Sequence, residues 1–230
     1  MTLTKFGIRE WGGSGIIALA LIGLCVWLAL KHSPVAGISL GSLVFIIWLV
    51  IAAFFRNPSR TIPAGGELIL SPADGVVKDI EVISNCEIDC FKDGKALRVG
   101  IFLSVLNVHL NRAPCELTVE YKQYREGRYL DARNPNCAKE NEAMTIGGKA
   151  MINGVSFPIG IRQISGAIAR RIVCSTTIGS KLAKGEIYGM IKFGSRTEIY
   201  LPVSDDFKLK VNIGDKVFAG VTTIATLTKK

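Results

Sequence analysis

Two long uncharged apolar segments near the N-terminus constrain the fold of this chain most strongly. The first covers residues 12–30 and the second covers residues 33–55. As a helix, either segment is long enough to cross the roughly 30 Å hydrocarbon core of a bilayer. A signal peptide has a shorter apolar core followed by a cleavage site with small residues, which Phe54-Phe55-Arg56 does not provide. We therefore expect residues 1–55 to form a membrane-anchoring helical hairpin.

The distribution of basic residues predicts the orientation of this hairpin. The short connection between the segments carries one lysine and one histidine, whereas two basic residues precede the hairpin and Arg56 and Arg60 follow it. Because basic flanks favour the cytoplasmic side, we expect residues 56–230 in the cytoplasm, at the inner cell membrane. A hairpin that dips into one leaflet is the alternative.

The formal net charge of +9 indicates an anionic partner. A basic domain held at a bilayer is attracted to anionic headgroups, so an anionic membrane surface is the expected partner. The basic residues are scattered and form no nucleic-acid-binding motif, so we expect no nucleic acid.

The remaining sequence is typical of a β protein. A Pro- and Gly-rich linker over residues 56–66 precedes short alternating segments that are separated by turn pairs such as Asn153-Gly154. This spacing predicts a mainly β (α+β) domain over residues 56–230, with a sandwich- or barrel-like core. The predicted strands cover residues 75–83, 96–104, 115–124, 186–193, 197–202, 207–211 and 222–227. Apolar residues recur every fourth position over residues 164–174 and predict one helix there.

The six cysteines do not predict a metal site. Cys86 and Cys90 are four residues apart, and no matching Cys or His pair follows them. Zinc sites need about four ligands at recognisable spacing, so we expect no metal and reduced thiols.

Three residues could together carry nucleophilic chemistry. Asp74 lies in an Asp-Gly turn, His109 lies in the segment FLSVLNVHLNRAP, and Ser195 follows Gly194 between two strand-like segments. Each one alone is more typical of a structural residue. Together they are the parts of a triad in which His removes the Ser proton and Asp orients the His. The G-x-S-x-G context of α/β-hydrolases is absent around Ser195.

The chain resembles phosphatidylserine decarboxylase proenzymes of the short prokaryotic (archaeal-type) family. The resemblance covers nearly the whole chain and rests on motifs that occur in the expected order. These motifs are the apolar hairpin, FFRNPSRTIP (54–63), SPADG (71–75), FLSVLNVHLNRAP (102–114), NE (141–142), RQISGAIARRIV (162–173), FGSR (193–196) and IGDKVFAGVTTIA (213–225).

The resemblance implies a proenzyme that cleaves itself between Gly194 and Ser195. A β chain of residues 1–194 and an α chain of residues 195–230 would remain together as a heterodimer. Ser195 would become a covalent pyruvoyl cofactor, and the enzyme would be a carbon–carbon lyase that converts phosphatidylserine to phosphatidylethanolamine. His109 would be the base and later a proton donor, and Asp74 its orienting acid.

Two positions depart from the family pattern. The usual Ser-Pro-x-Asp before the histidine is Ser104-Val105-Leu106-Asn107 here, and Arg112 stands where longer relatives have a second histidine. Arg112, Arg162 and Arg196 are candidates for headgroup contacts, because arginine suits bidentate recognition of phosphate and carboxylate. We expect the second Gly-Ser pair, Gly179-Ser180, to be a helix-ending turn.

Two other functions fit the same sequence. A membrane-tethered serine hydrolase would use the same Asp, His and Ser without cleaving its own chain. A non-catalytic membrane binding module is the other alternative, because residues 213–225 resemble the turn-rich strands of swivelling carrier domains.

Overall fold

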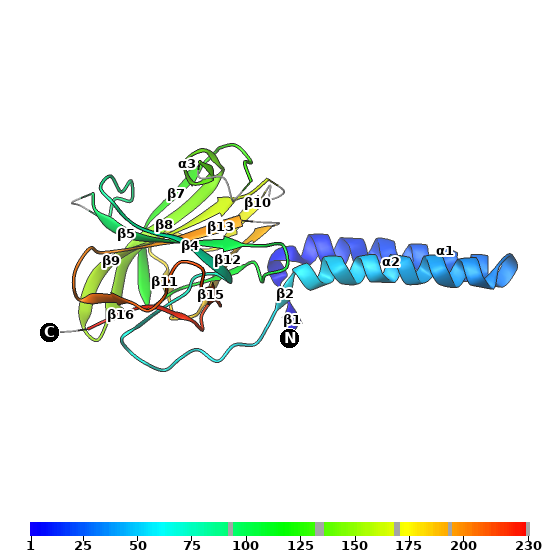
Figure 1. The fold of residues 1–230 in the computed structure, drawn as a ribbon. Helices are drawn as coiled ribbons and strands as arrows, with labels where there is room; N and C mark the ends of the chain where they lie inside the picture. The colour runs from blue at the N-terminus through cyan, green and yellow to red at the C-terminus, as the bar shows by residue number, and fades with distance from the viewer. Residues whose placement is uncertain (92–93, 132–135, 168–170, 193–194, 229–230) are drawn as a thin grey trace. The chain divides into compact units, whose positions relative to one another are not determined.

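The computed structural model describes residues 1–91, 94–131, 136–167, 171–192 and 195–228. The chain divides into two compact units, Met1–Ser59 and Arg60–Lys230. The first unit is mainly helical, and the second is built mainly from antiparallel strands (Figure 1).

The first unit contains the two helices that the apolar segments predict. Helix α1 covers Gly13–Lys31 and α2 covers Pro34–Phe54, and the two helices run antiparallel (Figure 1). Ser33 caps α2, because its Oγ accepts a hydrogen bond from the Ala36 N–H at 3.4 Å and a proline follows at the first helical position. A 3₁₀ turn, η1 (Lys5–Gly7), and a π-helical turn, η2 (Ile8–Gly12), lead into α1, and β1 (Thr2–Leu3) pairs with β2 (Arg56–Asn57).

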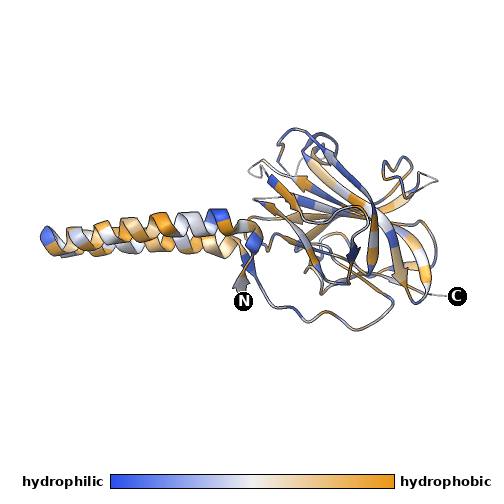
Figure 2. Cartoon of the chain, turned by 180° about the vertical axis from the view of Figure 1, so that it is seen from behind, coloured by the Kyte–Doolittle hydropathy of each residue, from blue (hydrophilic) through white to orange (hydrophobic). Residues whose placement is uncertain are grey.

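Both helices are long and apolar enough to cross a membrane. Figure 2 shows that most of their residues are hydrophobic. Many of these apolar side chains are exposed, and Ile16, Leu30 and Val35 are more than two-thirds exposed. Exposed apolar surface of this extent marks an interaction site, and for a helix of this length a lipid bilayer is a suitable partner. The helix pair is therefore compatible with membrane association.

The second unit is organised around a curled eight-stranded antiparallel sheet (Figure 1). Its strands, in sheet order, are β11 (Lys181–Leu182), β7 (Leu117–Arg125), β8 (Ala143–Ile152), β9 (Val155–Ser165), β13 (Ser195–Leu201), β5 (Ala96–Leu103), β4 (Gly75–Ile83) and β15 (Lys216–Val217).

Two three-stranded sheets complete the domain. One has the order β10 (Arg171–Cys174), β12 (Ile187–Lys192), β6 (Leu110–Arg112), and the other has the order β14 (Phe207–Leu209), β16 (Thr223–Leu227), β3 (Leu68–Leu70). A short helix, α3, covers Cys137–Glu140. The main hydrophobic core contains residues of the large sheet, such as Ile101 and Ile199, together with Ile69, Tyr188 and Ile224 of the small sheets. The core therefore lies between the large sheet and the two small ones.

The expected fold class is confirmed. Each of the seven predicted strands corresponds to an observed strand, with ends that differ by up to two residues. The alternation did not predict β8 and β9, which form a hairpin around Asn153-Gly154. These two residues have positive φ angles of 50° and 78°, as a tight two-residue hairpin turn requires.

The helix predicted over residues 164–174 is wrong. The segment begins in β9 and ends in β10, so Ile164 and Ile172 belong to two different strands, and Ile168 lies outside the described residues. Ile164 is paired with Ala143 of β8, and Ile172 with Ile191 of β12. Isoleucine and valine favour strands, and the pairing of the two ends of this segment with β8 and with β12 determined its structure. Gly179-Ser180 is a turn as expected, but it follows a strand, and Gly179 has a φ of +88°.

Candidate active site

Ser195 is the first residue of β13 and is completely buried. It is paired with Leu103 of β5 on one side and with Ser165 of β9 on the other. Among the described residues, its Oγ has no hydrogen-bond partner. A buried hydroxyl without a partner costs about 1–3 kcal/mol, so its presence indicates a role other than stability. Gly194, the other residue of the expected cleavage site, lies outside the described residues.

His109 is also completely buried, immediately before β6. Its Nδ1 lies 3.0 Å from the backbone carbonyl oxygen of Asn107. A carbonyl oxygen only accepts hydrogen bonds, so this contact places the proton of the neutral ring on Nδ1 and the lone pair on Nε2. His109 is therefore held in the tautomer in which Nε2 can act as a base.

A tight turn before His109 creates this contact. The Asn107 backbone N–H donates to the Ser104 carbonyl at 2.9 Å, and the Asn107 Oδ1 accepts from both the N–H and the Oγ of Ser104, at 2.9 and 2.8 Å. Asn107, which departs from the family pattern, thus closes the turn through its side chain. The departure keeps an acceptor oxygen at the position where an aspartate would supply one.

Asp74 lies at the end of the turn that leads into β4 and is 3% exposed. Arg60 donates two hydrogen bonds to its carboxylate, at 2.6 and 2.7 Å, and the Ala219 N–H donates a third at 2.8 Å. The next residue is a glycine, Gly75, because a Cβ at this position would lie 2.1 Å from the Phe102 carbonyl oxygen. In the described contacts, the Nδ1 of His109 therefore binds the carbonyl oxygen of Asn107. The Asp74 carboxylate binds Arg60 and the Ala219 N–H.

A buried polar network connects the three segments that carry Asp74, His109 and Ser195. Asn111 of β6 donates to the Thr197 Oγ1 at 3.1 Å and to the Pro72 carbonyl at 3.4 Å, and Gln163 donates to the Asn111 Oδ1 at 2.8 Å. Sequence reasoning missed Asn111, Gln163 and Thr197. A polar residue at a strand position that faces the core could have identified them from the sequence. Thr197 and Gln163 both occupy such positions.

Arg112 is close enough to Asp74 and Arg60 for their charges to affect its pKa. Its guanidinium donates to the Gly185 carbonyl at 2.8 Å, and its backbone N–H donates to the Pro72 carbonyl at 3.0 Å. Burial and the neighbouring Arg60 lower the pKa of Arg112, while the Asp74 charge opposes this change. Two guanidinium groups and one carboxylate therefore give this part of the site an excess of positive charge.

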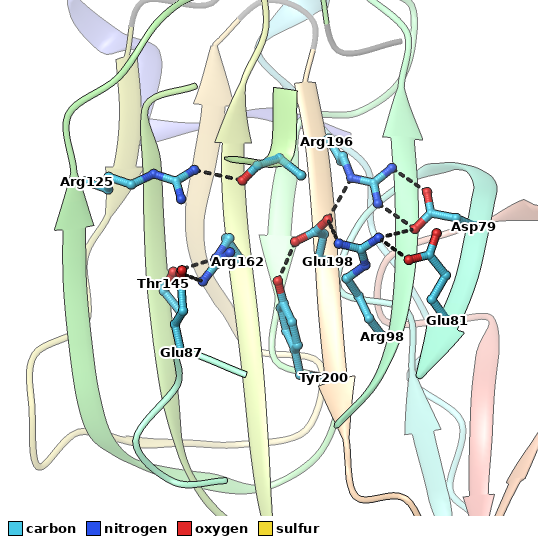
Figure 3. A network of polar contacts seen from close by, with 11 residues as sticks. Asp79, Glu81, Glu87, Arg98, Arg125, Thr145, Arg162, Arg196, Glu198 and Tyr200 are labelled. Carbon is cyan, nitrogen blue, oxygen red and sulfur yellow. Dashed lines mark hydrogen bonds and ion pairs between the residues drawn. The ribbon is translucent and has the colours of Figure 1, made fainter. Parts of the chain in front are cut away.

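Arg162 and Arg196 lie on the other face of the large sheet. Ser195, Thr197 and Ile199 alternate with Arg196, Glu198 and Tyr200 along β13, so the two sets face opposite sides. Figure 3 shows that the second set belongs to an ionic network, in which Arg196 donates to both Asp79 oxygens at 2.6 Å and to Glu198 at 2.9 Å. Arg162 of β9 lies opposite Glu198 in the strand register and lines a cavity of about 260 Å³ on this face.

Glu198 is the fully buried carboxylate at the centre of this network. It accepts from Arg196 and from the Tyr200 hydroxyl, and Arg98 lies 3.6 Å away. Although burial lowers the pKa of Arg196, the hydrogen bonds that Arg196 donates to Asp79 and the charges of Glu198 and Asp79 raise it, so the cation persists.

We expect Glu198→Ala to destabilise the fold by about 3 kcal/mol, because it leaves buried cations without their carboxylate. The melting temperature of the detergent-solubilised full chain measures this loss, with an expected decrease of about 10 °C. Glu81→Ala is the matched control, because Glu81 pairs with the same Arg98 but is 55% exposed. The exposed pair should contribute less than about 1 kcal/mol. Equal melting temperatures for the two variants would contradict the central role of Glu198.

The fold and the site together define a class of protein. A buried serine hydroxyl with no partner in the described part of the chain, a histidine held as a potential base and a buried acid are typical of an enzyme that uses serine chemistry. The family model for phosphatidylserine decarboxylase matches residues 48–225 of this chain.

Individual relatives agree with this match. A phosphatidylserine decarboxylase proenzyme of Carboxydothermus hydrogenoformans is 44% identical over 188 residues, which are 82% of this chain and 84% of the relative. Those of Geotalea daltonii and Ralstonia nicotianae are 40% and 36% identical, over 84% and 89% of this chain and 93% and 91% of the relative. This chain belongs to the phosphatidylserine decarboxylase family. The proenzyme names of these relatives fit a chain that is processed before it acts.

Proposed function

We propose that this protein converts phosphatidylserine to phosphatidylethanolamine and CO₂, after cleaving its own chain between Gly194 and Ser195. The observation that carries the proposal is the Ser195 hydroxyl, buried at the start of β13 without a hydrogen-bond partner among the described residues. Membership of the decarboxylase family supplies the reaction and the substrate class.

The self-cleavage needs only groups of this chain and one water molecule. The Ser195 Oγ attacks the Gly194 carbonyl carbon and its proton passes to Nε2 of His109, after which the Gly194–Ser195 C–N bond breaks and the nitrogen takes up a proton. This N→O acyl shift leaves an ester. Loss of the Ser195 Cα proton then expels the Gly194 carboxylate and leaves a dehydroalanine. Its tautomer reacts with water, which releases ammonia and leaves a pyruvoyl group at residue 195.

The surroundings of Ser195 fit this group. A pyruvoyl group has a keto oxygen in place of the serine hydroxyl, and among the described residues no hydrogen bond to the Ser195 Oγ has to be broken to form it. Such a group, bound covalently, acts as an electron sink for decarboxylation. We assign His109 as the residue that also returns a proton after CO₂ leaves, because its Nδ1 is fixed by Asn107 and its Nε2 carries the exchangeable proton.

Asp74, the acid of the proposed Asp, His and Ser set, has a supporting role. Asp74 keeps Arg60 in place and adds negative charge near the His109 segment. Of the three arginines that the sequence suggests for the headgroup, Arg112 is the best supported, because it lies on the side of Asp74. Arg162 and Arg196 are assigned to the ionic network instead, since Arg196 is saturated by Asp79 and Glu198.

The apolar helix pair supports a location at the membrane that contains the substrate. We propose that residues 1–55 anchor the protein in the inner cell membrane and that residues 56–230 lie in the cytoplasm. The two fragments are expected to stay together as a heterodimer, because β13 of the small fragment is paired with β5 and β9 of the large one.

Intact mass measurement of the purified protein tests this function. We expect two fragments, residues 1–194 and residues 195–230, with the second blocked to Edman degradation and modified by borohydride. Phosphatidylserine in mixed vesicles should lose CO₂ when the cleaved protein is added. An intact, serine-containing chain that decarboxylates would contradict the proposal, and an intact chain that hydrolyses acyl esters would favour the tethered serine hydrolase.

A further inference from the structure

Three side chains form a row across the end of the large sheet where β13 begins. Ser195 of β13 is opposite Ser165 of β9 in the ladder. Ile164 is opposite Ala143 of β8, and the Ser165 N–H donates to the Glu142 carbonyl at 2.9 Å, so the pairing continues by one residue and places Glu142 opposite Ser165. Residues directly opposite each other in antiparallel strands lie on the same face. Glu142, Ser165 and Ser195 are therefore neighbours in one row.

Each member of this row has a buried oxygen without a partner. Among the described residues, no hydrogen bond reaches the Glu142 Oε2, the Ser165 Oγ or the Ser195 Oγ. The two serines are completely buried, and Glu142 is 6% exposed. Buried oxygens of this kind each cost about 1–3 kcal/mol, so three in adjacent positions reduce the stability of the fold. Adjacent unsatisfied groups of this kind indicate a function.

The backbone at Ser165 is held firmly from the side of Glu142. The Asn141 Nδ2 donates to the Ser165 carbonyl at 2.7 Å, and the Asn141 Oδ1 accepts from the Leu130 N–H at 2.8 Å. The second oxygen of Glu142, Oε1, accepts from the Tyr124 hydroxyl at 3.1 Å, which fixes the plane of the carboxyl group. The motif Asn141-Glu142 thus fixes the backbone of Ser165 and the plane of the carboxyl group opposite it.

We propose that Ser165 and Glu142 are positioning residues for the self-cleavage of this chain. The three oxygens do not hydrogen-bond to one another in the structure. On side-chain rotation the Ser195 hydroxyl donates to the Ser165 Oγ, and the Ser165 hydroxyl donates to the Glu142 Oε2. Opposite Cβ atoms in a sheet lie about 4.5–5.5 Å apart, which lets two serine hydroxyls meet after rotation about their Cα–Cβ bonds. The contact fixes one rotamer of Ser195, the one from which its Oγ attacks the preceding carbonyl.

This role is compatible with His109 as the base. Rotation of the Ser195 hydroxyl about its Cβ–Oγ bond moves only the hydrogen atom. The contact with Ser165 sets the position of the oxygen before the attack, and the hydrogen then leaves Ser165 and turns toward Nε2 of His109. Glu142 acts through Ser165, and Ser165 acts on Ser195. The inference rests on the proposed self-cleavage at Ser195 and adds to it two residues that the Asp, His and Ser set does not include.

The rate of self-cleavage tests the inference. The full-length chain is synthesised without cells in the presence of lipid vesicles, and its cleavage is followed on denaturing gels. We expect Ser165→Ala to slow cleavage at least about tenfold, because misplacement of a nucleophile by 1 Å costs about a hundredfold. Glu142→Gln replaces the acceptor that faces Ser165 by a donor, and we expect a similar loss. In the double variant the second change should add less than about twofold, since both act through one contact.

A second measurement separates positioning from structural damage. In the structure the Ser165 Oγ has no hydrogen-bond partner among the described residues, so the melting temperature of Ser165→Ala should be unchanged or higher. Once cleaved, each molecule should decarboxylate within about threefold of the unaltered enzyme, because the Ser195 hydroxyl no longer exists. Ser156→Ala, on the exposed end of β9, and Glu120→Gln, on the surface of β7, are the matched controls and should cleave normally.

The outcomes are distinct for the two proposals. Cleavage of Ser165→Ala within twofold of the unaltered rate would overturn the inference, as would effects that multiply in the double variant or an equal loss of turnover after cleavage. If the unaltered chain is not cleaved at all, the proposed function fails instead. Because Glu142→Gln tests the same contact from its other end, failure of one variant to fold does not remove the test.

Discussion

Ser195→Ala is expected to remain a single chain of 230 residues and to have no decarboxylase activity. The variant lacks the oxygen that attacks the Gly194 carbonyl, and no pyruvoyl group can form from alanine. The loss is complete and is not a matter of rate, because a reacting atom is absent. Mass measurement after long incubation gives the first result, and CO₂ release from carboxyl-labelled phosphatidylserine gives the second.

The stability of this variant is part of the same prediction. The Ser195 Oγ is buried without a described partner, so its removal should leave the melting temperature unchanged or raise it slightly. Ser180→Ala is the matched control, because Ser180 also follows a glycine. Its Oγ accepts from the Thr177 N–H at 3.0 Å in an exposed turn. This control should cleave like the unaltered chain. Release of the 195–230 fragment from Ser195→Ala would refute the assigned cleavage site.

His109→Ala is expected to slow self-cleavage by about 10²- to 10⁴-fold, the usual contribution of a general base. The ring is buried, and the Asn107 carbonyl holds its Nδ1 so that Nε2 can take the Ser195 proton. The fraction that does cleave should also decarboxylate slowly, because His109 is needed again to supply a proton. This double effect distinguishes His109 from Ser165, whose loss should affect cleavage alone.

His32→Ala is the control for this experiment. His32 is the other histidine of the chain and lies at the end of α1, where its ring packs against Trp27 at 5.4 Å. We expect normal cleavage and turnover from it. The rates are measured on gels during synthesis, with the melting temperature as a check on folding. Cleavage of His109→Ala within threefold of the unaltered rate would assign the base to another residue.

Several features of this protein were predictable because they depend on local sequence. The two apolar segments are long and uncharged, and both form helices, since no tertiary contact is needed to favour a helix in such a segment. Strand alternation located seven strands for a similar reason. The helix predicted over residues 164–174 failed where the local pattern was ambiguous. There the ladder to Ala143 and the pairing of β10 with β12 decided the structure.

The candidate site was only partly predictable. Ser195, His109 and Asp74 were identified as residue types in recognisable motifs. Their partners were not, because Asn107 acts on His109 through a backbone carbonyl, and Arg60 reaches Asp74 from the linker. No residue pattern predicts a carbonyl contact or a pairing between segments that are distant in the chain.

The sequence by itself determined the family and the apolar helix pair, and it identified the serine that we propose as the reacting residue. These properties follow from composition and from motifs of a few residues, which are local. Only the tertiary structure decided that Ser165 lies opposite Ser195 and Glu142 opposite Ser165, and that Arg196, next to Ser195 in the chain, faces the other side of the sheet. The physical reason is strand geometry: neighbours in sequence point to opposite faces, whereas neighbours on a face come from strands that only the completed ladder brings together.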